Sequence, residues 1–326
     1  MRSPRISVYI TSYNQKEYLI EAIESVLNQT LKPFEIIIVD DCSTDGSQKI
    51  IADYALRYPD LIKPIYHDQN MGIASTRNTA LKAVQGDYVT FVDGDDRFLP
   101  NKIEKECQLF QINPSAHLVF SNFYSMTSEG RHLWLWADSE SPPQGDIFRQ
   151  TFTIDFPRGL HFRNELINYE AWKSVGFYDS KLLIYEDYEM RIRLTKKLHA
   201  VYNKEPAAEY RRHDGGLSAL KIDYHLDNLT YLYQKNLHLL DDLPDPDRKQ
   251  ILKRINHKIA ELIRGAAIRA IDRDRGSLAS RILALKYYLK ALKYQSGDPC
   301  FKLVSLMLIP YPWHLWLHKQ YMRLKA

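Results

Sequence analysis

Two groups of aspartates follow apolar runs that are typical of buried strands. Asp40 and Asp41 end the run FEIIIVDD. Asp93, Asp95 and Asp96 crowd the end of the run DYVTFVDGDD. Carboxylates on neighbouring loops repel one another, so they need a cation, hydrogen-bond donors or water to remain ionised together. Because oxygen ligands alone suit Mg²⁺ or Mn²⁺ rather than Zn²⁺, the pattern indicates a divalent-metal site, with a tight turn and helix N-cap as the alternative.

A second acidic pair, Glu186 and Asp187, lies in IYEDYEMRIRLTKK, in what we predict to be the opening turn of a helix. An anion is favoured at a helix start, so one interpretation of the pair is purely structural. The other is general-base catalysis, because a carboxylate within hydrogen-bond reach of an attacking hydroxyl accelerates the reaction by about 10²–10⁴-fold.

Alternating strand and helix patterns must position these acids. RISVYITSYN predicts a buried strand, EYLIEAIESVLNQT a helix and FEIIIVDD a second strand, which is a βαβ unit with a right-handed crossover. The helix IASTRNTALKAV then leads to the strand DYVTFV. Near-continuous apolar strands that alternate with helices predict an α/β fold with a doubly wound, mostly parallel sheet. In such sheets the ligand crevice lies at the carboxyl ends of the strands, where both aspartate groups fall.

The composition changes near Gly215, which suggests two regions. Residues 1–215 carry the alternating pattern and are predicted to form the catalytic domain. Residues 216–326 read as helices with breaks at LPDPD and DRDRGS, and are predicted to form a helical extension.

Overall composition narrows the functional class. The 326 residues are 45% hydrophobic and 26% charged, as expected for a globular protein, and the net charge of +4 with no interleaving of arginines and aromatic residues argues against nucleic-acid binding. The three cysteines are widely scattered, which fits a reducing compartment. The amino terminus matches neither a signal peptide nor a membrane span, so we expect a cytoplasmic location.

The order of the motifs resembles that of the family 2 glycosyltransferases, which have the GT-A fold. The resemblance is carried by the blocks ISVYITSYNQKEYLIEAIESVLNQT, EIIIVDDCSTDGS, NMGIASTRNTAL, GDYVTFVDGDD and YEDYEMRIRL, and covers roughly residues 5–218. It implies a nucleotide-sugar donor, a divalent metal and inversion at the anomeric carbon.

The resemblance also implies roles for residues near the amino terminus. Thr11 and Tyr13 of the block TSYN would contact the donor, with Tyr13 against the base. Asp41 would accept the imino hydrogen of uracil, which favours a UDP-sugar, since cytosine has no such hydrogen. Arg77 would lie beside the donor and offset the charge of its diphosphate.

The later blocks supply the metal site and the base. By resemblance, Asp95 would bind Mg²⁺ or Mn²⁺, and Asp93 would lie toward the ribose or the metal. Asp187 falls at the position of the catalytic base, with Glu186 as a partner of nearby donors.

The segment YRRHDGGLS carries two more candidates for donor binding. Arg212 or His213 would touch the diphosphate from a loop that covers the donor, and the alternative is an exposed loop without a ligand.

The carboxyl-terminal segment from Phe301 combines aromatic and aliphatic residues with lysine and arginine and has no acidic residue. Such segments lie on anionic membrane surfaces, which would make the protein peripheral on the inner face of the plasma membrane. The alternative is packing on the catalytic domain or on a second copy of the chain, in a homo-oligomer. A membrane location would suit a glycan or lipid-linked acceptor in cell-surface polysaccharide or lipopolysaccharide synthesis.

Two further classes of function are compatible with part of the pattern. A non-catalytic nucleotide-sugar or glycan-binding subunit of a synthesis complex would keep the donor pocket and act through its helical region. A nucleotidyltransferase would need a phosphate loop rich in glycine and basic residues near the amino terminus, and TSYNQKEY lacks one.

Overall fold

The computed structural model describes residues 4–213, 222–273, 282, 283, 285–287 and 289. The chain divides into two compact units, the first formed by residues 1–220 and 231–239 and the second by residues 221–230 and 240–326. The helix predicted over SLASRILALKYYLKALKY falls largely outside the described residues, and the tail from Phe301 falls entirely outside them.

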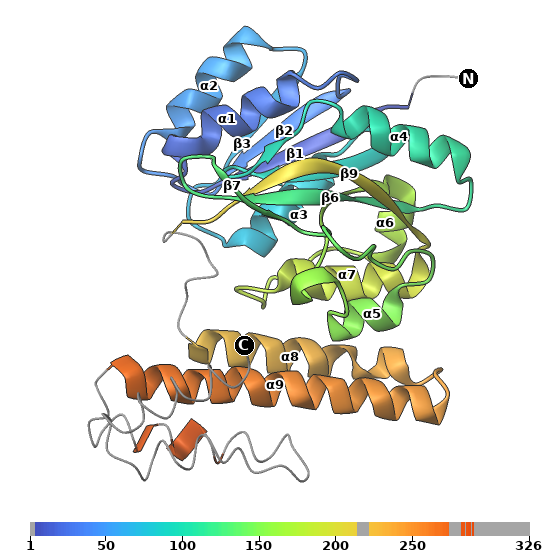
Figure 1. The fold of residues 1–326 in the computed structure, drawn as a ribbon. Coiled ribbons are helices and arrows are strands. Elements are labelled where there is room, and N and C mark those ends of the chain that lie inside the picture. The colour runs from blue at the N-terminus through green and yellow to red at the C-terminus, as the bar shows by residue number, and fades with distance from the viewer. Residues whose placement is uncertain (1–3, 214–221, 274–281, 284, 288, 290–326) are drawn as a thin grey trace. The chain divides into compact units, whose positions relative to one another are not determined.

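The amino-terminal half of the sheet is parallel, as the βαβ pattern predicts. Its strands lie in the order β3-β2-β1-β4 and are buried except for the partly exposed β3. Helices α1 and α2 cover one face and α3 the other (Figure 1). The strands are β1 (Ile6–Ser12), β2 (Glu35–Asp40), β3 (Ile62–Tyr66) and β4 (Tyr88–Asp93). The helices are α1 (Lys16–Leu27), α2 (Ser47–Arg57) and α3 (Ile73–Ala83).

The rest of the sheet is mixed, which corrects the prediction of a mostly parallel sheet. Beyond β4 the order is β8-β6-β9-β5, with β7 also paired to β6, and only the pair β6 and β9 is parallel. Antiparallel neighbours need no helical crossover, so this region lacks the alternating pattern that marks βαβ units. The strands are β5 (Arg97–Phe98), β6 (Leu118–Met126), β7 (His132–Leu135), β8 (Arg163–Asn168) and β9 (Ala200–Arg211).

Further helices complete the two units. Those of the first unit are α4 (Lys102–Ile112), α5 (Phe148–Thr153), a short 3₁₀ turn (Pro157–Gly159), α6 (Tyr169–Val175) and α7 (Glu186–Lys197). Helix α8 (Ile222–Asn236) and the 3₁₀ turn that follows it (Leu237–Leu240) contribute to both units.

In the second unit, α9 (Asp245–Arg273) buries isoleucines 251, 255 and 259 at the four-residue spacing of one helix face. None of the described helices combines the length and the apolarity that crossing a membrane requires.

The core between α4 and the sheet contains a buried ion pair. Lys102 and Glu106, each with a side chain 1% exposed, are joined by a 2.5 Å contact from Nζ to Oε2. Thr90 Oγ1 also accepts from Lys102 Nζ at 3.1 Å, and Ser121 Oγ donates to Glu106 Oε1 at 2.6 Å. Burial raises the pKa of the Glu106 carboxyl, and the charge of Lys102 offsets only part of this effect. The two charges are therefore stabilised by each other and by these hydroxyl groups, not by water.

Replacing Lys102 with methionine should lower the free energy of unfolding by about 3–5 kcal/mol at neutral pH, because a buried carboxylate then lacks its cation. Urea denaturation followed by circular dichroism measures this loss. The double variant Lys102→Met, Glu106→Leu should recover most of it, since no charge is left in the core. A double variant as unstable as the single one would contradict this account.

Candidate active site

The carboxyl ends of β1 and β4 place polar side chains next to each other. Thr11 and Asp93 are partners in register, and Thr11 Oγ1 donates to Asp93 Oδ1 at 2.9 Å. The adjacent glycine, Gly94, has no room for a Cβ atom, which would lie 2.4 Å from Gln15 Oε1 and 2.9 Å from Thr11 O. The DGDD loop is therefore held tightly against the end of β1.

Arg77 of α3 lies beside this loop and is only 4% exposed. Its Nη2 donates to both carboxylate oxygens of Asp93, at 2.9 and 3.0 Å, and its Nε lies 3.5 Å from Glu186 Oε1. The guanidinium also stacks 4.5 Å from the ring centre of Phe91. Neither Nε nor Nη1 has a hydrogen-bond partner among the described residues. The guanidinium of Arg77 thus lies between two acidic motifs, and its Nε and Nη1 are available as hydrogen-bond donors to a ligand.

The start of α7 carries the second acidic motif. Tyr185, with a left-handed φ of 66°, turns the chain into the helix, and Glu186 and Asp187 form its first turn. Asp187 Oδ2 accepts from Arg191 Nη1 at 2.6 Å. Arg191 in turn donates to both oxygens of Glu165 on β8, at 3.0 and 3.1 Å. Asp187 is therefore fixed in place by a buried arginine that a second carboxylate anchors.

Burial and neighbouring charges shift the pKa values of the two acids of this motif in opposite directions. Burial raises the pKa of the Asp187 carboxyl, but the charges of Arg191 and Arg77 outweigh it and leave that pKa well below its usual range. Burial raises the pKa of the Glu186 carboxyl to about 7, the charge of Asp187 adds to the increase, and Arg77 only partly offsets it. Near neutral pH, Asp187 is thus ionised while Glu186 is close to half protonated.

Replacing Glu186 with glutamine should stabilise the protein above pH 7. The raised pKa means that the folded state keeps a proton that the unfolded state releases, so wild-type stability falls as the pH rises from about 4.5 to about 7. The glutamine variant escapes this loss, and its free energy of unfolding should exceed that of the wild type by about 1–3 kcal/mol at pH 8. Urea denaturation at pH 4.5, 6 and 8 measures the difference, and equal pH dependence in both proteins would contradict it.

The DGDD loop also contacts the end of β9. His213 Nε2 lies 3.0 Å from Asp95 Oδ2, in an ion pair that raises the pKa of the imidazole. Arg211, which is buried, donates from Nε to the backbone oxygen of Asp95 at 2.8 Å, and its backbone N–H donates to Asp96 Oδ1 at 2.8 Å. Asp96 is therefore a structural hydrogen-bond acceptor inside the loop, a role that the sequence did not predict.

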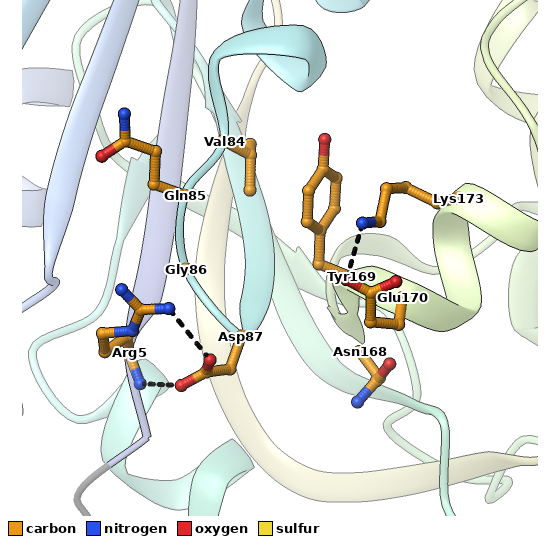
Figure 2. Close-up of a pocket in the computed structure, with 9 residues that line it drawn as sticks. All are labelled: Arg5, Val84, Gln85, Gly86, Asp87, Asn168, Tyr169, Glu170 and Lys173. Atoms are coloured by element: carbon orange, nitrogen blue, oxygen red, sulfur yellow. Dashed lines mark hydrogen bonds and ion pairs between the residues drawn. The ribbon is translucent and has the colours of Figure 1, made fainter.

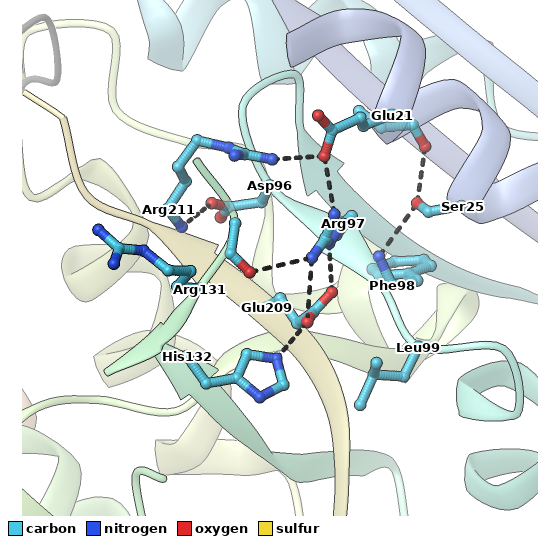
Figure 3. A network of polar contacts seen from close by, with 12 residues as sticks. Glu21, Ser25, Asp96, Arg97, Phe98, Leu99, Arg131, His132, Glu209 and Arg211 are labelled. Atoms are coloured by element: carbon cyan, nitrogen blue, oxygen red, sulfur yellow. Dashed lines mark hydrogen bonds and ion pairs between the residues drawn. The ribbon is translucent and has the colours of Figure 1, made fainter. Parts of the chain in front are cut away.

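Figure 3 shows the charged network that supports this loop. Arg211 Nη2 and Arg97 Nη1 donate to the same oxygen of Glu21 on α1, at 2.7 and 2.8 Å. Arg97 also donates to Glu209, which contacts His132 of β7. The loop is thus tied to α1, to β9 and to β7 together, and none of these links was predicted from the sequence.

The chemistry of the donor set fits a divalent cation at Asp95. Its carboxylate is 19% exposed and is an oxygen ligand of the kind that Mg²⁺ and Mn²⁺ prefer, and the imidazole that lies against it could join it as a ligand in its neutral form. Asp93, in contrast, is occupied by Arg77 and Thr11. Among the described residues, no group of three or more His, Cys, Asp or Glu side chains is arranged to hold a metal ion. Asp95 and His213 would therefore supply two ligands, with the remaining ones from phosphate and water.

Asp41 lies at the end of β2 in a buried position, with 2% of its surface exposed. Its Oδ1 accepts from His67 Nδ1 at 2.7 Å and from the Met71 N–H at 2.8 Å, while Oδ2 accepts from the Gly72 N–H at 2.9 Å. One acceptor position on Oδ2 is left for a ligand. Tyr13 lies on the adjacent loop with 49% of its surface exposed.

Arg212 lies apart from the other candidates. Side chains alternate along a strand, so Arg211 and His213 point to the DGDD loop and Arg212 points to the opposite face. There its Nε donates to Ser125 Oγ at 3.1 Å and its guanidinium lies 5.1 Å from the ring centre of Trp134.

A separate pocket of about 290 Å³ opens at the amino ends of β1 and β4, away from these residues (Figure 2). Its charged side chains are paired with each other, Arg5 with Asp87 at 3.3 Å and Lys173 with Glu170 at 2.6 Å. No predicted site residue lines it.

The chain is similar in sequence to known glycosyltransferases. Residues 7–168 match the model of the family described as Glycosyl transferase family 2. A Bacillus subtilis protein named as a teichuronic acid biosynthesis glycosyltransferase, TuaG, is 38% identical over 130 residues, which are 40% of this chain and 51% of that protein. The chain spans between about half and two thirds of the length of the first curated relatives that it matches.

Two solved structures share the fold. The S. aureus protein TarS 1–349, in complex with UDP-GlcNAc, gives a TM-score of 0.65 at 17% identity over 98% of this chain and 92% of its own. The mannosyltransferase PcManGT from Pyrobaculum calidifontis, in complex with GDP-Man and Mn²⁺, gives 0.58 at 17% identity over 97% and 88%. The GT-A fold expected from the sequence is confirmed.

Proposed function

Because the chain belongs to glycosyl transferase family 2, we propose that it transfers a sugar from a nucleotide-sugar donor to a hydroxyl group of a glycan or lipid-linked acceptor. The name of TuaG, with its reference to teichuronic acid, supports a role in cell-surface polysaccharide synthesis. We further propose inversion at the anomeric carbon and dependence on Mg²⁺ or Mn²⁺.

The observation that supports the proposal most is the position of Arg77. One guanidinium contacts Asp93 of the DGDD loop and lies beside Glu186 of the α7 motif, so both acidic motifs belong to one site. Its Nε and Nη1 atoms are buried without a hydrogen-bond acceptor among the described residues, and burying a donor without an acceptor is costly. A donor phosphate or sugar hydroxyl would supply the missing acceptors.

The proposed reaction is a single displacement. The acceptor oxygen attacks C1 of the sugar from the face opposite the leaving group, and the bond from C1 to the phosphate oxygen breaks with its electron pair on the nucleoside diphosphate. Asp187 takes the proton of the attacking hydroxyl, because it is ionised at neutral pH and 28% of its side chain is exposed. Arg191 holds the carboxylate in place for this transfer.

Charge develops on the departing diphosphate, and Arg77 is placed to stabilise it. Asp95 and His213 would hold the divalent cation, with Asp93 beside them, and the cation would act on the diphosphate as a Lewis acid. Glu186, next to Arg77, would adjust the charge of the sugar pocket rather than accept the proton itself.

We propose UDP as the nucleotide, with Thr11, Tyr13 and Asp41 on the donor side. Asp41 keeps one acceptor position that matches the N3–H of uracil. Guanine also carries an imino hydrogen, and PcManGT was solved with GDP-Man, so the two bases must be compared directly.

A thermal-shift panel tests the donor assignment. UDP, GDP, CDP and ADP are each added with and without Mn²⁺, because a ligand that binds only the folded state raises its melting temperature. UDP with Mn²⁺ should raise it most, and the increase should fall when Mn²⁺ is omitted. Equal increases for all four bases would contradict the role of Asp41.

We also propose that residues 1–215 carry the catalytic activity and that residues 216–326 form a helical extension. The composition of the tail from Phe301 supports contact with an anionic membrane surface, and contact with a second copy of the chain is the alternative.

A further inference from the structure

Arginine and aromatic side chains alternate across the sheet face that Arg212 occupies. The guanidinium of Arg158 lies 4.9 Å from the ring centre of Trp134, and that of Arg212 lies 5.1 Å from Trp134 and 6.0 Å from Tyr210. The guanidinium of Arg163 lies 3.6 Å from the ring centre of Tyr210. We name these five residues the Arg–aromatic row.

The strand register explains why these side chains share one face. Trp134 of β7 and Tyr210 of β9 both pair with Ser125, which lies on β6 between them. Residues paired directly across strands point to the same face, so the two rings flank Ser125. Arg212 follows Tyr210 by two positions, returns to this face and donates to Ser125 Oγ. The sheet register therefore sets the positions of Trp134, Tyr210 and Arg163, while Arg212 follows directly after β9 and Arg158 joins the row from the 3₁₀ turn.

The row has unbalanced positive charge. Arg158 is neutralised by Asp138, at 2.6 Å. For Arg163 and Arg212, no described carboxylate lies within ion-pair distance, so the aromatic rings are their main partners. Trp134 and Tyr210 are half-buried and Arg212 is exposed, so a ligand can reach both the rings and the charges.

The row leads to the proposed base. Arg163 and Glu165 both lie on β8, with the left-handed Asn164 between them, and Glu165 anchors the arginine that holds Asp187. Arg163 is also close enough for its charge to act on Asp187: burial raises the pKa of that carboxyl, and Arg163 is among the guanidinium groups that lower it. Strand β8 thus links the row to the residues that hold the proposed base.

We propose that the Arg–aromatic row binds the acceptor and selects an anionic glycan. Sugar rings stack on Trp134 and Tyr210, and carboxylate or phosphate groups of the glycan pair with Arg163 and Arg212. The inference rests on the proposed sugar transfer for the identity of the ligand as an acceptor. Arg212 is not assigned to the donor diphosphate, because it points away from the DGDD loop.

Direct binding tests the inference without relying on transfer. Three oligosaccharide probes are titrated into the full chain by calorimetry: oligogalacturonate, which carries carboxylates, a glycerol phosphate oligomer, which carries phosphodiesters, and neutral maltohexaose. At least one anionic probe should bind about tenfold or more tightly than maltohexaose, and the one that does identifies the anionic group. Raising the salt from about 0.05 to 0.5 M should weaken that binding severalfold, because exposed charges are screened.

Variants locate the binding. Arg163→Gln and Arg212→Gln should each weaken binding of the anionic probe by roughly tenfold, as expected for the loss of a charged hydrogen bond. Arg131→Gln is the matched control, because Arg131 lies on the turn before β7 with 81% of its side chain exposed, and it should change binding by less than about twofold. Circular dichroism checks that each variant is folded. If Arg163→Gln does not fold, Arg163→Lys takes its place and should weaken binding by a smaller factor, because lysine keeps the charge but not the planar fork of donors.

Three outcomes would overturn the inference. The first is equal binding of the neutral and anionic probes, and the second is an equal loss in the Arg131 control. The third is binding of phosphatidylglycerol vesicles through Arg163 and Arg212 when no oligosaccharide binds, which would make the row a membrane contact. If the anionic probe binds through the row but no sugar is ever transferred, the proposed function fails while the binding surface remains.

Discussion

Replacing Asp187 with asparagine should lower the rate of sugar transfer by about 10²–10⁴-fold, the contribution that a positioned general base makes. Asparagine keeps the shape of the side chain, and its one carbonyl oxygen can still accept from Arg191 in place of Oδ2, but it cannot take a proton. Nucleotide binding should persist, because the donor candidates lie at the ends of other elements. The measurement is the initial rate of nucleoside diphosphate release with donor and acceptor, together with the thermal shift caused by the nucleotide.

The matched control is Glu170→Gln, which also removes a carboxylate near the start of a helix. Glu170 lies on α6 with 81% of its side chain exposed and, among the described residues, forms an ion pair only with Lys173, so its loss should change the rate by less than about twofold. A transfer rate in Asp187→Asn within tenfold of the wild type would show that another group takes the proton. If neither the wild type nor any variant transfers sugar, the chain is the non-catalytic subunit that the sequence also allows.

Asp95→Asn should lower kcat/KM by about 10²–10³-fold and abolish the increase in melting temperature caused by Mn²⁺ with UDP. The variant removes a charged oxygen ligand, and His213 alone is then left to hold the cation. The melting temperature without ligand should change little, because Arg211 donates to the carbonyl of Asp95 and not to its side chain, so this contact of the loop survives the substitution.

The neighbouring Asp96→Asn is a sharp control for this prediction. Burial raises the pKa of the Asp96 carboxyl well above its usual range, and the charge of Asp95 raises it further. A neutral asparagine resembles the protonated acid and can still accept from the Arg211 N–H through Oδ1. Activity should therefore stay within about tenfold of the wild type. Equal losses in the two variants would mean that the loop fails as a whole and that Asp95 has no separate role.

Local patterns in the sequence were sufficient to predict the parallel half of the sheet. Strands β1, β2 and β4 are short apolar runs that alternate with helices up to β4, and the rule that ligands bind at the carboxyl ends of such strands brings Thr11 and Asp93 together. The family resemblance added Arg77, whose place beside the acids no periodicity indicates.

Contacts over long separations could not be predicted in the same way. Glu165 and Arg191 meet because β8 is inserted antiparallel between β4 and β6, and no local pattern marks that insertion. A signal existed in RNELIN, where Glu165 stands directly before the apolar pair Leu166 and Ile167, so that, if the segment is buried, its carboxylate must find a partner. The case of Arg211 and Arg212 is different: the alternation of a strand would have shown that only one of them shares a face with His213.

The β6–β7 hairpin serves two parts of the molecule at once. Its Trp134 belongs to the Arg–aromatic row, while its His132 contacts Glu209 and the preceding turn accepts from Arg211 through Ser128. A chimaera that grafts this hairpin from a relative to alter acceptor choice would also disturb the support of Asp95. Engineering for new acceptors should therefore exchange Trp134 and its immediate neighbours one at a time, and retain the imidazole that anchors the strand.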